Sequence, residues 1–276
     1  MRGITLHSVV PVRASASEAA EQLTQLLFAE TFDILQQVPR WTEICLHTDS
    51  QKGWVDTKMI VPLTDEEFLS LPTTDETHMP ARVAYPMVYA VSTVNGQTFP
   101  LTASTVLPDY KDGTFSLLGA TLRIDTAMVA EKPFVLSQEQ LMNVIRYFLN
   151  IPYLWGGKNA MGMDCSGFVQ VIYSLFGYSL PRNASQQAER GETVDSLTQV
   201  QAGDLAFFDH ADVDPMRTNI SHVGILLDGE RIVHCSGRVK VERIDQQGIY
   251  SKEAADREHP DGQYTHHLAC IKRIQL

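Results

Sequence analysis

One stretch of the sequence places a cysteine where a helix is predicted to begin. Asp164 is a favourable N-cap residue, Cys165 follows it, and apolar residues then recur at helical spacing as far as Gly177. The first turn of a helix offers unpaired backbone N–H groups and the positive end of the helix dipole. Both features stabilise a thiolate, so we expect Cys165 to ionise readily and to act as a nucleophile. Taken alone, such a residue is also compatible with a buried structural cysteine.

Two histidines follow in a predicted β-hairpin. Asp228 and Gly229 mark its turn, between a strand that begins at His222 and a strand that contains His234. A two-residue loop would place His222 opposite Cys235. We favour a three-residue loop with Gly229 in a left-handed bulge, which places the two histidines opposite each other, about 5 Å apart at Cβ. A nucleophile, a base and a group that orients the base are the three parts of covalent catalysis.

Together with their surroundings, these residues resemble the NlpC family of papain-like cell-wall peptidases, over about residues 135 to 275. The resemblance implies an α+β fold, in which a papain-like core packs the nucleophile helix against an antiparallel sheet. It implies that Cys165 is the nucleophile, that His222 is the general base and acid, and that His234 orients His222. The motifs that carry it occur in order along the chain: Tyr153–Gly157 with Asp164–Phe168, Gly203–Leu205, Ser221–Gly224 and His234–Gly237.

The resemblance also implies a set of substrate contacts. Tyr153 and Trp155 would line the cleft, with the Tyr153 hydroxyl beside the developing oxyanion; core packing is the alternative for both. Asp164 would face the free amine of the substrate, helped by a glutamate of the first SH3-like domain, for which Glu21 is the candidate. Its alternative role is that of a helix cap. Two serines would contact substrate or only cap local backbone, Ser166 and Ser185.

A chain of 276 residues is long enough for two or three domains. Residues 1–65 read as short strands between polar turns, and Gly53 and Trp54 together with the run 21–30 resemble a bacterial SH3-like domain. Residues 66–132 are predicted to be a linker, opening with a short helix, and a second, divergent SH3-like barrel that ends in a strand over 117–125. The NlpC-type domain, 133–276, begins with a helix capped by Ser137.

Composition limits the classes of partner. Hydrophobic residues make up 44% and charged residues 20%, as in ordinary globular chains, and the net charge of −11 disfavours binding to nucleic acid or to an anionic membrane. The N-terminus lacks the apolar segment of a signal peptide, so we expect a cytoplasmic protein, or an exported one whose signal peptide is missing from the sequence. Four scattered cysteines suit a reducing compartment. Adjacent His266 and His267 point to opposite faces of a strand, and we expect neither a metal nor a cofactor.

The sequence therefore predicts a monomeric cysteine endopeptidase that hydrolyses the γ-D-glutamyl-L-diamino acid bond of murein peptides with a free N-terminal L-Ala. The alternatives are an amidase or acyltransferase of the same fold, and a non-catalytic peptidoglycan-binding protein. One departure from the family pattern concerns the amine-binding wall, where Gln51 and Lys52 replace an aromatic residue. The long polar segment 209–219 is interpreted as a lid over the cleft or as a surface excursion.

Overall fold

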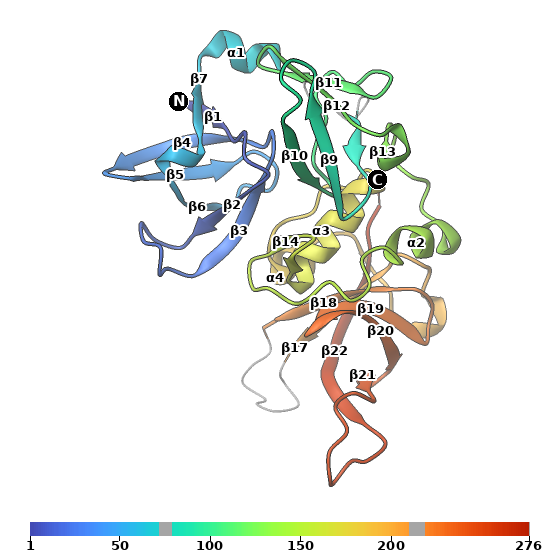
Figure 1. The fold of residues 1–276 in the computed structure, drawn as a ribbon. Coiled ribbons are helices and arrows are strands. Elements are labelled where there is room, and N and C mark those ends of the chain that lie inside the picture. Colours follow the sequence, from blue (N-terminus) through green and yellow to red (C-terminus); the bar gives the residue numbers. More distant parts are fainter. Residues whose placement is uncertain (72–78, 210–218, 276) are drawn as a thin grey trace. The chain divides into compact units, whose positions relative to one another are not determined.

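The computed structural model describes residues 1–71, 79–209 and 219–275 (Figure 1). Two compact units can be distinguished by the contacts within the chain. The first unit comprises residues 1–134, 155–162 and 171–179, and the second comprises residues 135–154, 163–170 and 180–276. We describe each unit by itself.

The first unit begins with a seven-stranded antiparallel sheet in the order β3-β2-β6-β5-β4-β1-β7. Side chains that alternate along these strands are buried in a common core, including Val10, Val12, Phe32 and Ile44. Short strands separated by turns occupy most of residues 1–65, as predicted. The strands are β1 (Arg2–Ile4), β2 (Val9–Arg13), β3 (Gln22–Leu27), β4 (Thr31–Val38), β5 (Trp41–Leu46), β6 (Lys52–Asp56) and β7 (Val61–Leu63).

The remainder of the first unit contains the predicted short helix and two small sheets, and its core joins that of the N-terminal strands. Thr64 caps the helix, since its hydroxyl accepts a hydrogen bond from the Glu67 N–H at 3.1 Å. Whether the sheets form a second SH3-like barrel stays a prediction. The elements are η1 (Thr57–Met59), α1 (Asp65–Ser70), β8 (Arg82–Val83), β9 (Met87–Ser92), β10 (Thr98–Thr102), β11 (Thr114–Leu117), β12 (Ala120–Arg123), η2 (Thr126–Met128), β13 (Val129–Ala130) and β14 (Lys158–Asn159).

The single strand predicted over residues 117–125 is wrong, because the chain turns back within it. Strands β11 and β12 form a hairpin in which Leu117 pairs with Ala120. Leu118 has φ 48° and Gly119 has φ 79°, the left-handed pair that a two-residue hairpin turn requires. A leucine is unusual at such a position, which is why the turn could not be predicted from the sequence.

The second unit is built on a sheet that closes on itself. Strand β22 pairs with β17 through its C-terminal half and with β21 through its N-terminal half, so six strands form a barrel, with β16 added outside β22. Register shifts between Phe207 and Phe208 and between Ile249 and Tyr250 mark bulges where β22 changes partners. The strands are β15 (Gly162–Met163), β16 (Glu192–Thr193), β17 (Leu205–Asp209), β18 (His222–Leu226), β19 (Arg231–Ser236), β20 (Arg238–Asp245), β21 (Gly248–Ser251) and β22 (Gln263–Arg273).

Short helices accompany this sheet. Ser137 caps α2 as predicted, since its hydroxyl accepts a hydrogen bond from the Gln140 N–H at 3.1 Å. Helix α3 begins at Cys165, and the ring of Phe168 on its first turns packs edge-on against Phe148 at 6.4 Å between centroids. None of the described helices is both long and apolar enough to span a bilayer. The helices are α2 (Gln138–Ile145), α3 (Cys165–Leu175), α4 (Ala184–Gln187) and η3 (Leu197–Gln199).

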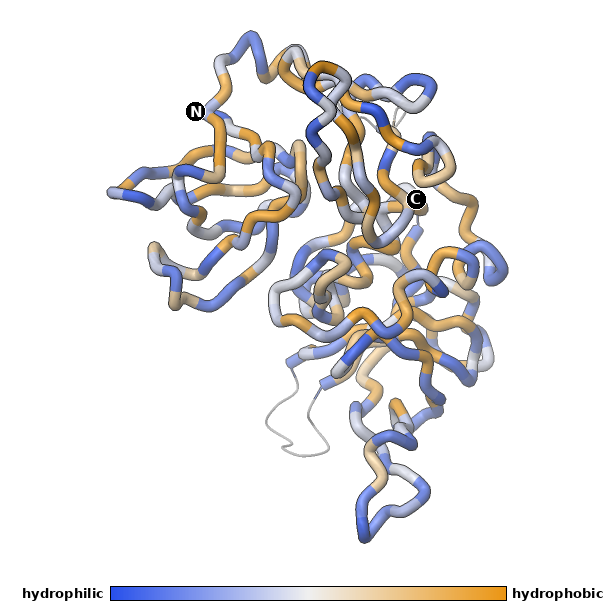
Figure 2. Tube along the Cα trace, viewed as in Figure 1, coloured by the Kyte–Doolittle hydropathy of each residue, from blue (hydrophilic) through white to orange (hydrophobic). Residues whose placement is uncertain are grey.

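Strands β17 and β18 are buried along their whole length, which makes them the centre of the second unit. In Figure 2 the excursion between β21 and β22, residues 252–262, is mostly hydrophilic. The catalytic candidates at the start of β18 and within β19 therefore lie on rigid, buried strands.

Candidate active site

Asp164 holds the start of α3 in place. Its Oδ1 accepts a hydrogen bond from the Gly167 N–H at 2.7 Å, which is the capping contact predicted from the sequence. The Arg182 guanidinium donates to both carboxylate oxygens, at 3.1 Å to Oδ1 and 2.5 Å to Oδ2, and to the Ser166 hydroxyl at 2.8 Å. Arg182 is only 2% exposed, so this is a buried, bidentate ion pair. Sequence reasoning missed Arg182, although it lies only three residues before the predicted substrate contact Ser185.

Cys165 occupies the predicted first position of α3, but its ionisation does not follow the prediction. Burial raises the pKa of the Cys165 thiol to about 11, and the charge of neighbouring Asp164 adds to the rise. Hydrogen bonds from the Val223 and Ser166 N–H groups act in the opposite direction and do not offset burial. The expectation that Cys165 ionises readily is therefore wrong for the resting site. The thiol requires a base when it reacts, and the Val223 contact places it beside the residue that follows His222.

The two histidines on the hairpin are hydrogen-bonded, although the predicted register is wrong. Gly224, and not His222, lies opposite His234, and the three-residue loop is 228–230. The Asp228 carboxylate accepts from the N–H groups of Glu230 and Arg231, which shapes this loop without the left-handed Gly229 that was expected. His222 and His234 are thus diagonal neighbours on one face, and Nε2 of His222 lies 2.9 Å from Nδ1 of His234.

A carboxylate extends this pair into a line of three groups. Nε2 of His234 lies 2.8 Å from Oε2 of Glu242, on neighbouring strand β20, and the Lys240 ammonium lies 3.2 Å from the same oxygen. Burial alone would raise the pKa of Glu242, but the hydrogen bond to His234 and the nearby charges lower it to about 2. An ionised Glu242 accepts the Nε2 proton of His234, so Nδ1 of His234 accepts in turn from His222. The remaining nitrogen of His222, Nδ1, is thereby left as the basic one. Sequence reasoning missed Glu242.

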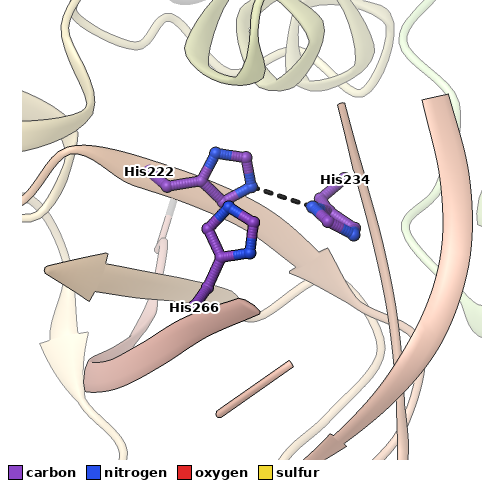
Figure 3. Close-up of side chains that lie close together, drawn as sticks. All are labelled: His222, His234 and His266. Atoms are coloured by element: carbon purple, nitrogen blue, oxygen red, sulfur yellow. Dashed lines mark hydrogen bonds between the residues drawn. The ribbon is translucent and has the colours of Figure 1, made fainter. Parts of the chain in front are cut away.

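A third histidine joins this group from β22. The His266 ring lies against that of His222, with centroids 4.2 Å apart and an angle of 32° between planes, and its centroid lies 5.6 Å from that of His234. Figure 3 shows His266 beneath His222, while the dashed line marks the contact between His222 and His234. His267 instead contacts Asp209, with 3.2 Å between Nδ1 and Oδ1. The prediction that the adjacent histidines point to opposite faces is confirmed, but the neighbours of His266 were not foreseen.

Tyr153 belongs to the same unit as the nucleophile. Its N–H donates to the Gly237 carbonyl at 2.9 Å, which fixes it beside the end of β19. Burial raises the pKa of the Tyr153 phenol strongly, and the charges of Cys165 and Asp164 raise it further. The phenol therefore stays protonated at neutral pH and is close enough to the thiol to feel its charge. A protonated phenol can donate a hydrogen bond to an oxyanion.

Trp155 and Glu21 come together in the first unit. The Trp155 indole Nε1 donates to Oε1 of Glu21 at 2.8 Å, and the Trp155 side chain is 60% exposed. An indole that is 60% exposed is not packed in a core, which was the alternative; its contact with substrate stays a prediction. Ser185 is exposed on α4, whereas Ser166 is buried against Arg182. The predicted lid lies almost wholly at residues 210–218, which are outside the described residues.

Two family models match this chain. The NlpC/P60 family matches residues 150–258, and the bacterial dipeptidyl-peptidase Sh3 domain matches residues 12–60. A relative from Bacillus subtilis, named gamma-D-glutamyl-L-lysine dipeptidyl-peptidase, is 38% identical over 42% of this chain. A protein of the same name from Bacillus cereus is 25% identical over 76% of this chain. The chain spans 38% and 66% of the lengths of these two relatives.

Two solved structures have a fold similar to that of this chain. The structure of an NlpC/P60 family protein from Bacillus cereus superposes with a TM-score of 0.78 at 18% identity, covering 99% of both chains. An NlpC/P60 endopeptidase from Photobacterium damselae superposes with a TM-score of 0.73 at 17% identity, covering 98% of this chain and 72% of that one. At such identities the likeness establishes the fold alone. Residues 150–258 therefore form an NlpC/P60-family domain, and residues 12–60 form a bacterial Sh3 domain that precedes it in the chain.

Proposed function

We propose that this protein is a cysteine peptidase that hydrolyses the γ-D-glutamyl-L-diamino acid bond of murein peptides with a free N-terminal L-Ala. The observation that carries the proposal is the hydrogen-bonded line from His222 through His234 to Glu242, next to a thiol at the start of α3. The names of the two Bacillus relatives support the choice of bond. The corresponding role is the trimming of released wall fragments for recycling.

The proposed reaction depends on transfer of the Cys165 thiol proton to the basic nitrogen of His222. The Cys165 thiol transfers its proton to Nδ1 of His222 as the sulfur attacks the γ-carbonyl carbon of D-glutamate. The charge on the carbonyl oxygen is stabilised by the backbone N–H of Cys165 and by the Tyr153 hydroxyl. His222 then donates its proton to the amine of the diamino acid, the C–N bond breaks, and a thioester remains. Water, deprotonated by His222, releases the D-glutamyl carboxylate and restores the thiol.

We further propose that a carboxylate of the Sh3 domain selects the free amine of L-Ala. Glu21 is exposed and lies against the Trp155 indole, so an ammonium group there would meet both a negative charge and an aromatic face. Asp164 is a less available partner, because both of its oxygens already accept from Arg182. Blocking the amine would remove the positive charge that the Glu21 carboxylate attracts, so the blocked peptide is expected to bind less tightly.

The proposal is tested with L-Ala-γ-D-Glu-diaminopimelate and its N-acetylated form in ¹⁸O water. Mass spectrometry is expected to show free diaminopimelate and an L-Ala-D-Glu product that carries one ¹⁸O atom. Formation of an unlabelled acyl product in the presence of an amine acceptor would instead identify an acyltransferase. Cleavage of another bond, or equal cleavage of the acetylated peptide, would overturn the proposed specificity.

Two variants separate catalysis from binding. Cys165→Ala is expected to abolish turnover. If the unmodified protein binds the wall but shows no turnover, the non-catalytic alternative is favoured. Glu21→Gln is expected to raise KM for the free tripeptide about tenfold, the order of one exposed charge contact. Glu18→Gln is the matched control, since Glu18 is an exposed glutamate near Glu21 that pairs with Arg13 and Arg40.

A further inference from the structure

Three histidines from three different strands gather at the proposed active site, and the peptidase mechanism uses only two of them. His222, His234 and His266 each offer one ring nitrogen, and these nitrogens all lie within 4.8 Å of one another. The first two are buried and the third is half-buried. In Figure 3 the His266 ring lies against that of His222, and His234 lies at the other end of the dashed contact.

We propose that these three imidazoles form an inhibitory binding site for a divalent transition-metal ion, of which Zn²⁺ is the best match. Three neutral imidazoles are a ligand set that suits Zn²⁺, whereas Mg²⁺ and Ca²⁺ prefer oxygen ligands. The inference goes beyond the proposed peptidase activity and departs from the sequence-based expectation of no metal. The site exists independently of that activity, but inhibition as its consequence rests on the proposed function.

The distances suit the proposed ion. Two nitrogens bound at about 2.1 Å to one tetrahedral ion lie roughly 3.4 Å apart. The contact between Nε2 of His222 and Nδ1 of His234 is 2.9 Å, and no pair of ligand atoms is separated by more than 4.8 Å. Rotations of the side chains that change the separation between two nitrogens by at most about 1.4 Å are therefore sufficient. The ion would take the place between the rings that the Nε2 proton of His222 occupies, and that proton would move to Nδ1 of the same ring.

Hydrogen bonds on the outer side of two rings prepare them as ligands. Glu242 holds Nε2 of His234 at 2.8 Å, which directs Nδ1 toward the ion, an arrangement common behind metal-bound histidines. The Thr265 hydroxyl lies 2.8 Å from Nδ1 of His266, and in the proposed arrangement this ring binds the ion through Nε2. Glu242 therefore supports both states of the site, with a proton or with a metal between the rings.

The nitrogen of His222 that binds the ion determines how the ion inhibits the peptidase, and it makes Cys165 unnecessary as a ligand. The ion would bind His222 through Nε2, on the edge of the ring that faces His234, whereas Nδ1 serves the thiol. With the ion on Nε2, the neutral His222 ring carries its proton on Nδ1, which can then no longer accept the proton of Cys165. Cys165 is not a ligand in this arrangement. This distinguishes the proposed site from a metal held between the thiol and His222.

The test measures metal binding in the Cys165→Ala background, with Co²⁺ as a spectroscopic probe and Zn²⁺ by competition with a chromophoric chelator. We expect one Co²⁺ per chain, with the absorption of a tetrahedral site and without a sulfur-to-cobalt band. Adding His266→Phe keeps an aromatic ring against His222 and is expected to weaken binding about 100-fold. His267→Phe on the same strand is the matched control and is expected to change affinity less than about threefold.

Absence of binding in Cys165→Ala, or equal affinity with and without His266, would overturn the proposal. The second arm measures turnover of the tripeptide by protein with Cys165 intact. Zn²⁺ is expected to inhibit reversibly, and a chelator is expected to restore the rate. The Zn²⁺ concentration for half-inhibition is expected to be higher for His266→Phe than for the unmodified protein, with each rate expressed relative to the uninhibited rate of the same protein. If Co²⁺ binds as stated but no murein peptide is cleaved, the proposed function fails and the metal site stands.

Discussion

His234 lies opposite Gly224, and the absence of a side chain at residue 224 allows the His234 ring to reach diagonally to Nε2 of His222. The two ring nitrogens are 2.9 Å apart although the residues are not directly paired across the strands. A Cβ atom at residue 224 would lie 2.9 Å from Cβ of His234 and 2.7 Å from Cδ1 of Ile232. Gly224 thus leaves room for the contact between His222 and His234, although it has no side chain that could react.

Gly224→Ala is expected to lower kcat by roughly 100-fold, the order of a misplaced general base. Overpacking is expected to lower the free energy of unfolding by about 1–3 kcal/mol. Combining it with Ile232→Val removes the Cδ1 contact but leaves the contacts with Cγ1 of residue 232 and with Cβ of His234. The double variant is therefore expected to regain part of the stability in denaturant unfolding and not to regain kcat. Recovery of kcat in the double variant would show that the His234 contact does not control the reaction.

Glu242 is expected to act by fixing which nitrogen of His234 carries the proton. Glu242→Met removes the acceptor and is expected to lower kcat roughly 10- to 100-fold with little change in KM, since substrate need not contact this residue. Glu242→Gln keeps an oxygen that can accept from Nε2 and is expected to retain more activity. Nitrogen NMR of the His234 ring reports the tautomer directly. Glu253→Gln, which alters the outer partner of Lys240 at 3.3 Å and the partner of Arg238 but not the contact with Glu242, is the control.

The ion pair between Arg182 and Asp164 is expected to contribute mainly to the free energy of unfolding. Arg182→Met leaves the Asp164 carboxylate buried without its ion-pair partner, which typically costs about 3–5 kcal/mol of unfolding free energy. Adding Asp164→Asn removes the orphaned charge, and urea unfolding of the double variant is expected to show partial recovery. Arg182→Lys keeps the charge without the bidentate contact, and its unfolding free energy is expected to lie between those of the unmodified protein and Arg182→Met. Strictly additive losses in this cycle would argue against coupling between the residues.

The loop that joins β18 and β19 is expected to be sensitive to acid. Burial would raise the pKa of Asp228, but hydrogen bonds and the charge of Arg231 hold it below its usual value of 3.8. A lowered folded-state pKa contributes stability above the unfolded-state value, and that contribution is lost as the pH falls. The difference in unfolding free energy between the unmodified protein and Asp228→Asn is therefore expected to be constant near neutral pH and to shrink below about pH 4. A difference that grows toward acid pH would contradict this sign.

The sequence by itself determined the features that depend on neighbouring residues. Asp164 was identified as the cap of α3 and Cys165 as its first residue because capping uses groups within one turn of the chain. Ser137 at the start of α2 and the strand β5 follow from the same local rules. The ordered motifs also identified His222 and His234 as partners, and their hydrogen bond is confirmed.

The tertiary structure decided what depends on residues far apart in the chain. The contact of Arg182 with Asp164 requires the return of the segment before α4 to the start of α3, and no spacing in the sequence encodes it. His266 reaches His222 only because β22 pairs with both β17 and β21 and closes the barrel. The high pKa of Cys165 likewise arises because burial, a property of the whole packed unit, outweighs the local effect of a helix start.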